Sequence, residues 1–359
     1  MPVTFTPSNA STTPLKVAAV QAEPVWLDRQ GSIEKTIKII NEAAAEGAKI
    51  IGFPEVFIPG YPWTPFCNGH KESAPVLKAY QANSLPLHSP EMERIQDAVK
   101  AAGVEIVLGF SERDGGSLYI AQVTITSDGV IANHRRKIKP TFYEKTVYGD
   151  GSAQSIYNVV QTKHGRLGSL NCWEHIQPLL KAHFYSQHPQ IFVGGWWPAF
   201  SPGKGGAPYI ISGEASSRMS QMVAMEGGCF GIVACQVVTQ AGAEKMKIAG
   251  FPWFDVPGGG FSTIYGPDGS TLVEPVDPGV EAILYADISL DKIDEVKLIA
   301  DNQGNYSRGD LFHLVVSAKS PASGNWDQVD YMDEKDVEAA KERDGVINNI
   351  AGGLPRVEL

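Results

Sequence analysis

The sequence of 359 residues predicts an α/β protein built on a mixed sheet, and two observations favour this fold class. Short apolar runs rich in strand formers alternate with longer segments whose apolar residues recur at helical spacing, as they do in β-α-β units. Two pairs of strand-like runs are separated by short turns that contain glycine, which predicts hairpins. Because hairpins pair strands antiparallel, a purely parallel sheet is disfavoured.

The alternation starts at the N-terminal end of the chain. Leu15–Gln21 (LKVAAVQ) predicts a strand, and Ser32–Ala45 spaces its isoleucines three or four residues apart, which predicts an amphipathic helix. Next we expect a strand at Ile50–Phe53, a helix at Glu91–Ala102 and a strand at Glu105–Phe110.

The same rhythm continues through the second half of the chain. The expected elements are a strand at Leu167–Asn171, a helix at Ile176–Ser186, a strand at Gln190–Gly194, a helix at Ser212–Glu226 and a strand at Phe230–Cys235. The two expected hairpins pair Leu118–Ile125 with Val130–Ile138 and Ser262–Tyr265 with Leu272–Val276. Beyond about Ser317 the sequence turns polar and charged, so we expect one domain over 15–317 and a polar tail over 318–359.

Composition excludes several classes of protein. A net charge of -10 disfavours a surface for nucleic acid, because acidic side chains repel phosphates. Four cysteines are too few for a disulfide framework, and none stands in a zinc-binding pattern. The N-terminal residues do not resemble a secretory signal, and no run of apolar residues is long enough to span a membrane. We therefore expect a soluble, cytoplasmic protein with reduced thiols.

Three segments place reactive side chains at the ends of predicted strands, where open α/β sheets carry their sites. These segments are Phe53–Glu55, Arg135–Thr141 and Asn171–His175. A carboxylate, an ammonium and a thiol brought together would let the cation stabilise a thiolate while the carboxylate moves protons. Lys137 and Lys139 are both open as the cation, since residues two apart on a strand share a face.

In this order the three segments resemble the Glu-Lys-Cys triad of the nitrilase superfamily, and the nitrilase branch matches best. The resemblance runs from about Lys16 to Val316 and includes Pro59–Pro62 (PGYP) and Asn133–Lys137 (NHRRK). It implies that Cys172 is the nucleophile and Glu55 the general base.

The resemblance also selects Lys137, rather than Lys139, as the stabilising cation, and makes Glu144 a second glutamate beside the triad. It implies a four-layer α-β-β-α sandwich, with two central mixed sheets flanked by helices. It further implies homodimers or larger spiral homo-oligomers, and chemistry that needs no metal or organic cofactor.

The implied activity is that of a nitrilase, which hydrolyses a small organic nitrile with water to a carboxylic acid and ammonia. Aromatic residues follow Glu55, and others follow the strand that comes after Cys172. We expect Tyr61, Trp173 and Trp197 to bind substrate. Aryl nitriles or arylacetonitriles are therefore preferred, although large aromatics also suit subunit contacts.

The alternative to nitrile hydrolysis is an activity on cyanide, either hydration or dihydration. Hydration of an organic nitrile to an amide by the same triad belongs to this alternative. Fungal enzymes that act on cyanide commonly read Cys-Trp-Glu-Asn, whereas this chain has His175, which favours organic nitriles. An amidase, or a scaffold without catalysis, is less favoured.

The remaining candidates are interpreted as structural. A single cysteine between apolar strands is usually inert core, and this is expected of Cys67, Cys229 and Cys235. His175 is expected to be structural because consecutive side chains on a helical turn diverge. Gly203–Gly206 and Gly258–Gly260 fit no nucleotide-binding spacing and are expected to be loops.

Overall fold

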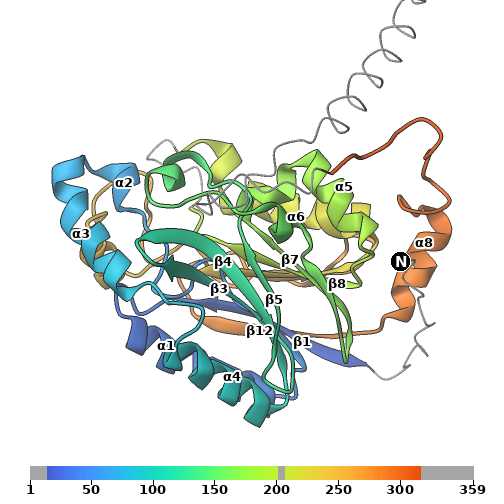
Figure 1. Cartoon of the computed structure of the whole chain (residues 1–359), viewed down its shortest axis with the longest axis horizontal. Helices are drawn as coiled ribbons and strands as arrows, with labels where there is room; N and C mark the ends of the chain where they lie inside the picture. The colour runs from blue at the N-terminus through green and yellow to red at the C-terminus, as the bar shows by residue number, and fades with distance from the viewer. Residues whose placement is uncertain (1–13, 201–206, 317–359) are drawn as a thin grey trace, which may run out of the picture. The chain divides into compact units, whose positions relative to one another are not determined.

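The computed structural model describes residues 14–200 and 207–316, which alternate strands and helices along the chain (Figure 1). The polar tail expected over 318–359 and the loop expected at Gly203–Gly206 lie outside the described residues. The strands are β1 Leu15–Ala22, β2 Ile50–Gly52, β3 Glu105–Asp114, β4 Ser117–Ile125, β5 Ile131–Arg136, β6 Val159–Thr162, β7 Gly165–Asn171, β8 Ile191–Trp196, β9 Phe230–Gln236, β10 Thr263–Tyr265, β11 Thr271–Val273 and β12 Ala282–Ile288.

The α-helices are α1 Arg29–Ala45, α2 Thr64–Cys67, α3 His70–Asn83, α4 Pro90–Ala102, α5 Pro178–Ser186, α6 Gly213–Gly227, α7 Gln240–Lys245 and α8 Asp291–Ile299. The four helices that the sequence predicts are present as α1, α4, α5 and α6, and each begins and ends within three residues of its predicted position. Short 3₁₀ turns are η1 Phe142–Thr146, η2 Ala153–Ile156, η3 Cys172–Ile176 and η4 Tyr209–Ile211. Capping explains the boundaries of α4, since the Ser89 hydroxyl accepts from the Met92 amide and Gly103 ends the helix in the left-handed region.

The strands form one continuous mixed sheet in the order β5-β4-β3-β2-β1-β9-β8-β7-β6. Both expected hairpins are present, as the antiparallel pairs β4 with β5 and β10 with β11. The two expected sheets are the two halves of this single sheet. They are joined by a short parallel pairing of Gln21 with Cys235 and of Ala22 with Gln236.

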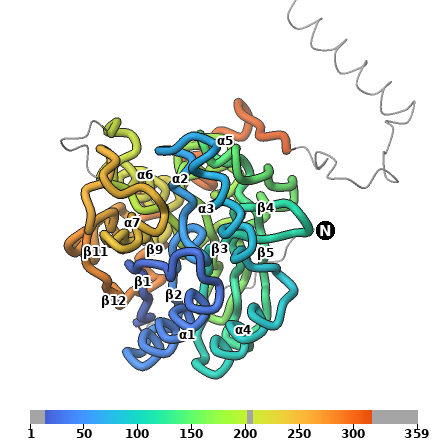
Figure 2. Tube along the Cα trace, turned by 90° about the vertical axis from the view of Figure 1, so that its left-hand side faces the viewer, coloured from blue at the N-terminus to red at the C-terminus, as the bar shows by residue number. Residues whose placement is uncertain are grey.

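The two halves pack face to face, so the inner strands are buried on both faces. On β1, Val17 and Ala19 point into the core between the halves, whereas Ala18 and Val20 point outward to α1 and α4. This alternation explains why β1 reads as an unbroken apolar run, because both of its faces are covered. Helices α1 and α4 cover one half of the sheet, and α5 and α6 cover the other, as both views show (Figures 1 and 2).

Several elements, among them α3, β12 and α8, fall where the sequence analysis expects none. Helix α3 contains Pro75, which weakens its helical signal. Strand β12 pairs antiparallel with β1 along seven residues, a partner far away in the sequence. Helix α8 buries only Ile293, so its apolar periodicity is weak. Within the described ranges, no helix combines the length and the apolar character that crossing a bilayer requires.

Candidate active site

Four side chains from distant parts of the sequence meet at the ends of three strands. Glu55 follows β2, Lys137 follows β5, Cys172 follows β7, and Glu144 lies on η1. The Lys137 ammonium donates to Glu55 Oε1 at 2.9 Å and to Glu144 Oε2 at 2.9 Å. Sγ of Cys172 lies within 4.8 Å of an oxygen of each carboxylate. All four residues are buried, so the sequence-predicted catalytic set forms a single cluster.

The backbone beside this cluster is strained. Positive φ angles occur at Cys172 itself (47°), at Val56 after Glu55 (40°) and at Phe142 on the turn that carries Glu144 (51°). Left-handed backbone is unfavourable for residues other than glycine, and it persists where the surrounding structure imposes it. Strain of this kind concentrates at functional sites, which agrees with a site in which the backbone aims the side chains.

A local signal in the sequence accounts for the orientation of Glu144. Thr141 and Glu144 form a capping box at the start of η1, with the Thr141 amide donating to Glu144 Oε2 at 2.6 Å. The turn η3, which begins at Cys172, repeats the arrangement, since the Asn171 amide donates to Glu174 Oε2 at 2.9 Å. Sequence reasoning missed the buried Glu174, although its spacing from Asn171 is that of a capping box.

Burial dominates the acid–base behaviour of Glu55. Desolvation raises the pKa of the Glu55 carboxyl to about 8. Attraction to Lys137 acts to lower this pKa, and repulsion from the neighbouring Glu144 acts to raise it further. Its Oε1 is bonded to Lys137, whereas its buried Oε2 has no hydrogen-bond partner among the described residues. One oxygen of Glu55 is therefore able to accept a proton from a reacting group.

Lys137 and Cys172 are coupled electrostatically. Burial alone would lower the pKa of the lysine, but attraction to Cys172 and to the two carboxylates raises this pKa well above its ordinary value. Burial raises the pKa of the Cys172 thiol, while Lys137 and the backbone N–H of Trp173 act in the opposite direction. The cluster thus holds a charged lysine and a neutral thiol that becomes a thiolate once a base removes its proton. The two carboxylates and the thiol could ligate a cation, but the ammonium already bonds both carboxylates.

The structure separates the two candidate lysines. Strand β5 ends at Arg136, so the rule that residues two apart share a face does not apply to Lys137 and Lys139. Lys139 is exposed, and its ammonium lies 2.6 Å from a carboxylate oxygen of Asp150.

The three expected substrate-binding residues lie near the cluster in different environments. Tyr61 is buried, and its hydroxyl donates to Glu144 Oε1 at 2.6 Å, so its polar end is engaged by the site itself. Trp197 packs edge-on against Tyr61 and stacks on Trp63 at 4.9 Å between ring centroids. The buried indole N–H groups of Trp173 and Trp197 have no hydrogen-bond partner among the described residues, so two donors are left unpaired.

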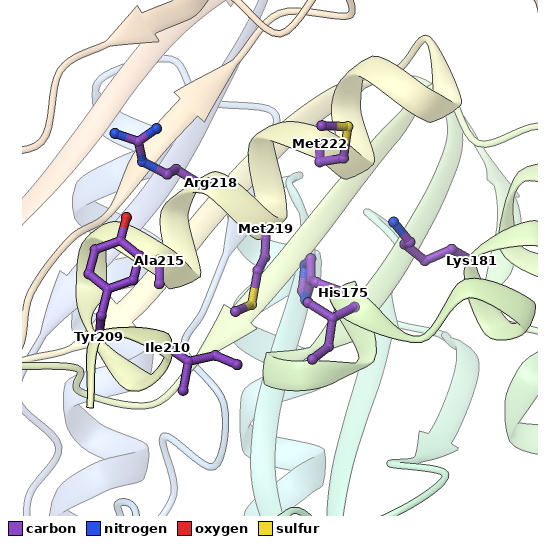
Figure 3. A pocket seen from close by; sticks show the side chains of 9 residues that line it. His175, Lys181, Tyr209, Ile210, Ala215, Arg218, Met219 and Met222 are labelled. Carbon is purple, nitrogen blue, oxygen red and sulfur yellow. The ribbon is translucent and has the colours of Figure 1, made fainter. Parts of the chain in front are cut away.

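The ring of His175 contacts the backbone of Cys172 through the Cys172 carbonyl oxygen. Burial lowers the pKa of its imidazole to about 4, so the ring is neutral and Nδ1 donates to the Cys172 carbonyl oxygen at 2.6 Å. The same ring borders a pocket of about 560 Å³ between η3, η4, α5 and α6 (Figure 3). This placement agrees with a structural role.

The other three cysteines have environments that suit inert thiols. Burial raises the pKa of Cys67, of Cys229 and of Cys235 to about 12 in each case, and among these thiols no lysine lies close enough to reverse the shift.

Comparison with known proteins identifies the family. Residues 16–298 match the family described as carbon-nitrogen hydrolase. A cyanide hydratase of Armillaria gallica is 72% identical over 98% of this chain and 98% of its own length. A nitrilase of Talaromyces marneffei is 50% identical over 84% of this chain and 95% of its own. The fold is similar to that of a carbon-nitrogen hydrolase of Helicobacter pylori, with a TM-score of 0.65 at 19% identity over 84% of this chain and 100% of that one.

The chain therefore belongs to the carbon-nitrogen hydrolase family, within the nitrilase superfamily. The resemblance inferred from the three sequence segments is confirmed, and so is the α/β fold class.

Proposed function

We propose that this chain hydrates hydrogen cyanide to formamide, with Cys172 as nucleophile, Glu55 as general base and Lys137 as the cation that stabilises negative charge. The observation that carries the proposal is the buried cluster in which Lys137 bridges Glu55 and Glu144 beside the Cys172 thiol. The 72% identity to a cyanide hydratase along nearly the whole chain favours cyanide over a larger nitrile.

The reaction begins with the thiol. Glu55 takes the thiol proton through its Oε2, and the Cys172 thiolate attacks the carbon of hydrogen cyanide. The proton then passes from Glu55 to the nitrile nitrogen, which gives a neutral thioimidate and leaves Glu55 deprotonated. Glu55 then accepts a proton from water as the water oxygen adds to the same carbon, and it passes this proton to the nitrogen, which gives a neutral tetrahedral intermediate. Lys137 and the backbone N–H of Trp173 face the charge that develops during these steps.

The product depends on which bond of the tetrahedral intermediate breaks. If the carbon–sulfur bond breaks and the hydroxyl proton passes to Glu55, formamide is released and the thiolate is regenerated. If the carbon–nitrogen bond breaks and that proton passes to the nitrogen, ammonia is released and a thioester is left for a second water. A charged Lys137 beside the sulfur stabilises the departing thiolate, which favours the amide.

The aromatic side chains support a small substrate. Trp63, Trp197 and Tyr61 lie with their ring centroids about 5 Å apart, so the rings contact one another and leave no slot between them for an aryl group. Hydrolysis of an organic nitrile to an acid and ammonia is the second candidate, and the 50% identity to a nitrilase favours it. Sequence alone ranks organic nitriles first, whereas the more similar relative reverses that order.

Product analysis tests the proposal. Wild-type protein, Cys172→Ala and the control Cys67→Ala are incubated with cyanide, benzonitrile, phenylacetonitrile and phenylacetamide, and formamide, ammonia and acids are measured together. We expect formamide from cyanide with little ammonia, a loss of about 10⁴-fold or more in Cys172→Ala, and activity within about twofold of wild type in the control.

Each other outcome points to a different activity. Formate with ammonia from cyanide identifies a dihydratase, and acid with ammonia from an organic nitrile alone identifies a nitrilase. Turnover of phenylacetamide alone identifies an amidase. No turnover of any substrate contradicts the proposal and favours a scaffold.

We also propose that the chain forms homodimers or larger homo-oligomers. Large apolar side chains that line the pocket of Figure 3 are exposed, among them Tyr209, Ile210 and Met222, and Leu179 on α5 is exposed as well. Contiguous apolar surface of this kind is typical of contact faces. Light scattering on wild type and on Leu179→Glu tests this, and a monomeric wild type contradicts it.

A further inference from the structure

A third carboxylate, that of Glu174, is buried close to the cluster without belonging to it. Its Oε1 accepts from Arg135 Nη2 at 2.7 Å and from the Ile138 amide at 3.0 Å, and its Oε2 accepts from the Asn171 amide at 2.9 Å. Buried charges are costly unless they are paired and hydrogen-bonded, and Glu174 meets both conditions. Burial would raise the pKa of Glu174, but the Arg135 guanidinium and the amides of Ile138 and Asn171 together outweigh burial and lower this pKa, so the carboxylate is charged.

The partners of Glu174 flank two of the proposed catalytic residues. Ile138 directly follows Lys137, and Asn171 directly precedes Cys172. Strand β5 leads to the lysine and β7 to the cysteine, and these strands lie toward opposite ends of the sheet order with no ladder between them. Strand pairing therefore does not fix the separation between the ammonium and the sulfur, whereas the Glu174 carboxylate bonds the backbone on both sides.

Arg135 is itself held in a fixed orientation. Its Nε donates to the Ser155 carbonyl at 3.1 Å and its Nη1 to Gln122 Oε1 at 2.8 Å. Gln122 in turn donates to the Leu170 carbonyl at the end of β7, at 3.3 Å. The guanidinium is fully buried, so its contacts are shielded from water. The network thus connects β4, β5, η2 and β7 around the site.

We propose that Glu174, paired with Arg135, is a positioning residue that sets the distance between Lys137 and Cys172 for catalysis. It does not touch the reacting atoms. Its effect is to hold two backbone segments in register, so that the ammonium faces the sulfur and the intermediates formed on it. Small misplacements of catalytic groups are costly, since about 1 Å lowers rates by as much as about 100-fold.

The variant Glu174→Gln tests this with little change in volume. A glutamine has one oxygen, whereas hydrogen-bond donors face both oxygens of Glu174, so one side of the bridge must be lost in either orientation of the amide. We expect kcat to fall by about 100-fold while KM changes by less than about threefold, because binding is not the step affected. Peptide mass spectrometry should show Cys172 alkylated by iodoacetamide about tenfold more slowly, since the thiolate loses its cation.

The matched control is Glu112→Gln. Glu112 is also a buried carboxylate, and it pairs with Arg136 at 2.7 Å. Its partners among the described residues are side chains, whereas Glu174 bonds the backbone next to Lys137 and Cys172. We expect a comparable loss of thermal stability, with kcat and the alkylation rate within about twofold of wild type. This control separates positioning from general destabilisation.

A second variant keeps the proposal testable if Glu174→Gln does not fold. Arg135→Lys retains the positive charge but loses the separate guanidinium N–H donors that bond Ser155, Gln122 and Glu174 at the same time. We therefore expect a fall in kcat of about tenfold. The inference is overturned if folded Glu174→Gln or Arg135→Lys protein has the same kcat and the same rate of Cys172 alkylation as the Glu112→Gln control. The inference rests on the proposed catalytic roles. If wild-type protein converts no nitrile, the proposed function fails, and the alkylation rates alone decide whether Glu174 positions Cys172.

Discussion

Lys137 and Lys139 are two residues apart, yet their ammonium groups lie in opposite environments. Lys137 is buried and bonded to both Glu55 and Glu144, whereas Lys139 is exposed beside Asp150. The chain leaves β5 at Arg136, and this change of direction sends one lysine inward and the next outward. The pair offers an internal comparison between a charge in the site and a charge in solvent.

Replacement of each lysine by glutamine should therefore have very different effects. In Lys137→Gln we expect kcat on cyanide to fall by about 10³-fold, because a preorganised charge that stabilises the intermediates is lost. In Lys139→Gln kcat should remain within about twofold of wild type, since exposed ion pairs contribute little. Steady-state kinetics on both variants check this, and equal losses would contradict the assignment of the cation.

The Tyr61 hydroxyl should act through Glu144 rather than through substrate. Tyr61→Phe removes a buried hydrogen bond of 2.6 Å to that carboxylate, and hydrogen bonds to charged groups are worth about 1.5–3 kcal/mol. We expect kcat to fall about tenfold with KM nearly unchanged. The control is Tyr80→Phe, which removes bonds to the Gly60 carbonyl and to Tyr148 away from Glu144. It should lower the melting temperature only, and a raised KM in Tyr61→Phe would favour direct substrate binding.

Activity should rise with pH up to the region where Glu55 loses its proton. The pKa of this carboxyl is raised from 4.5 to about 8, and only the deprotonated form accepts a proton. We expect kcat/KM, measured at a constant concentration of undissociated hydrogen cyanide, to increase with a midpoint near pH 8. A profile that is flat from pH 6 to 9 would argue against Glu55 as the base.

The same shift has a consequence for stability. Between pH 4.5 and about 8 the folded state holds a proton on Glu55 that the unfolded state releases, so the free energy of unfolding falls as pH rises through this window. The variant Glu55→Gln lacks this titration. Its melting temperature, relative to that of wild type, should therefore rise with increasing pH, and a constant difference would contradict the raised pKa.

Gly109 on β3 leaves room for the segment that carries Glu55. A Cβ at Gly109 would lie 2.3 Å from the Pro54 carbonyl oxygen and 3.0 Å from Glu55 Cα. Because these are backbone atoms, Gly109→Ala must displace the segment, and we expect a destabilisation of about 1–3 kcal/mol with reduced kcat. Gly116→Ala, whose Cβ meets no atom within 4 Å, is the control and should be neutral. Thermal melts and kinetics check both variants.

The strand and helix pattern was readable from local sequence because periodicity reports burial. The apolar run of β1 and the helical spacing of α1 and α4 give their types and near-correct bounds. Strand β12 and helix α8 were missed, since β12 is defined by its pairing with β1 and α8 buries a single side chain. Local sequence also does not report which distant strands pair. The two expected sheets were therefore not recognised as one, since only two residues of β1 and two of β9 join them.

The sequence by itself determined which residue types are proposed to carry the chemistry, because Glu55, Lys137 and Cys172 each follow a recognisable strand. Only the tertiary structure decided which lysine is buried, that the Tyr61 hydroxyl binds Glu144, and that Glu174 links the lysine and cysteine segments. These facts depend on contacts between residues up to 83 positions apart, for which adjacent sequence carries no signal. Periodicity reports which side of an element is buried, and the packing of several elements determines what that side meets.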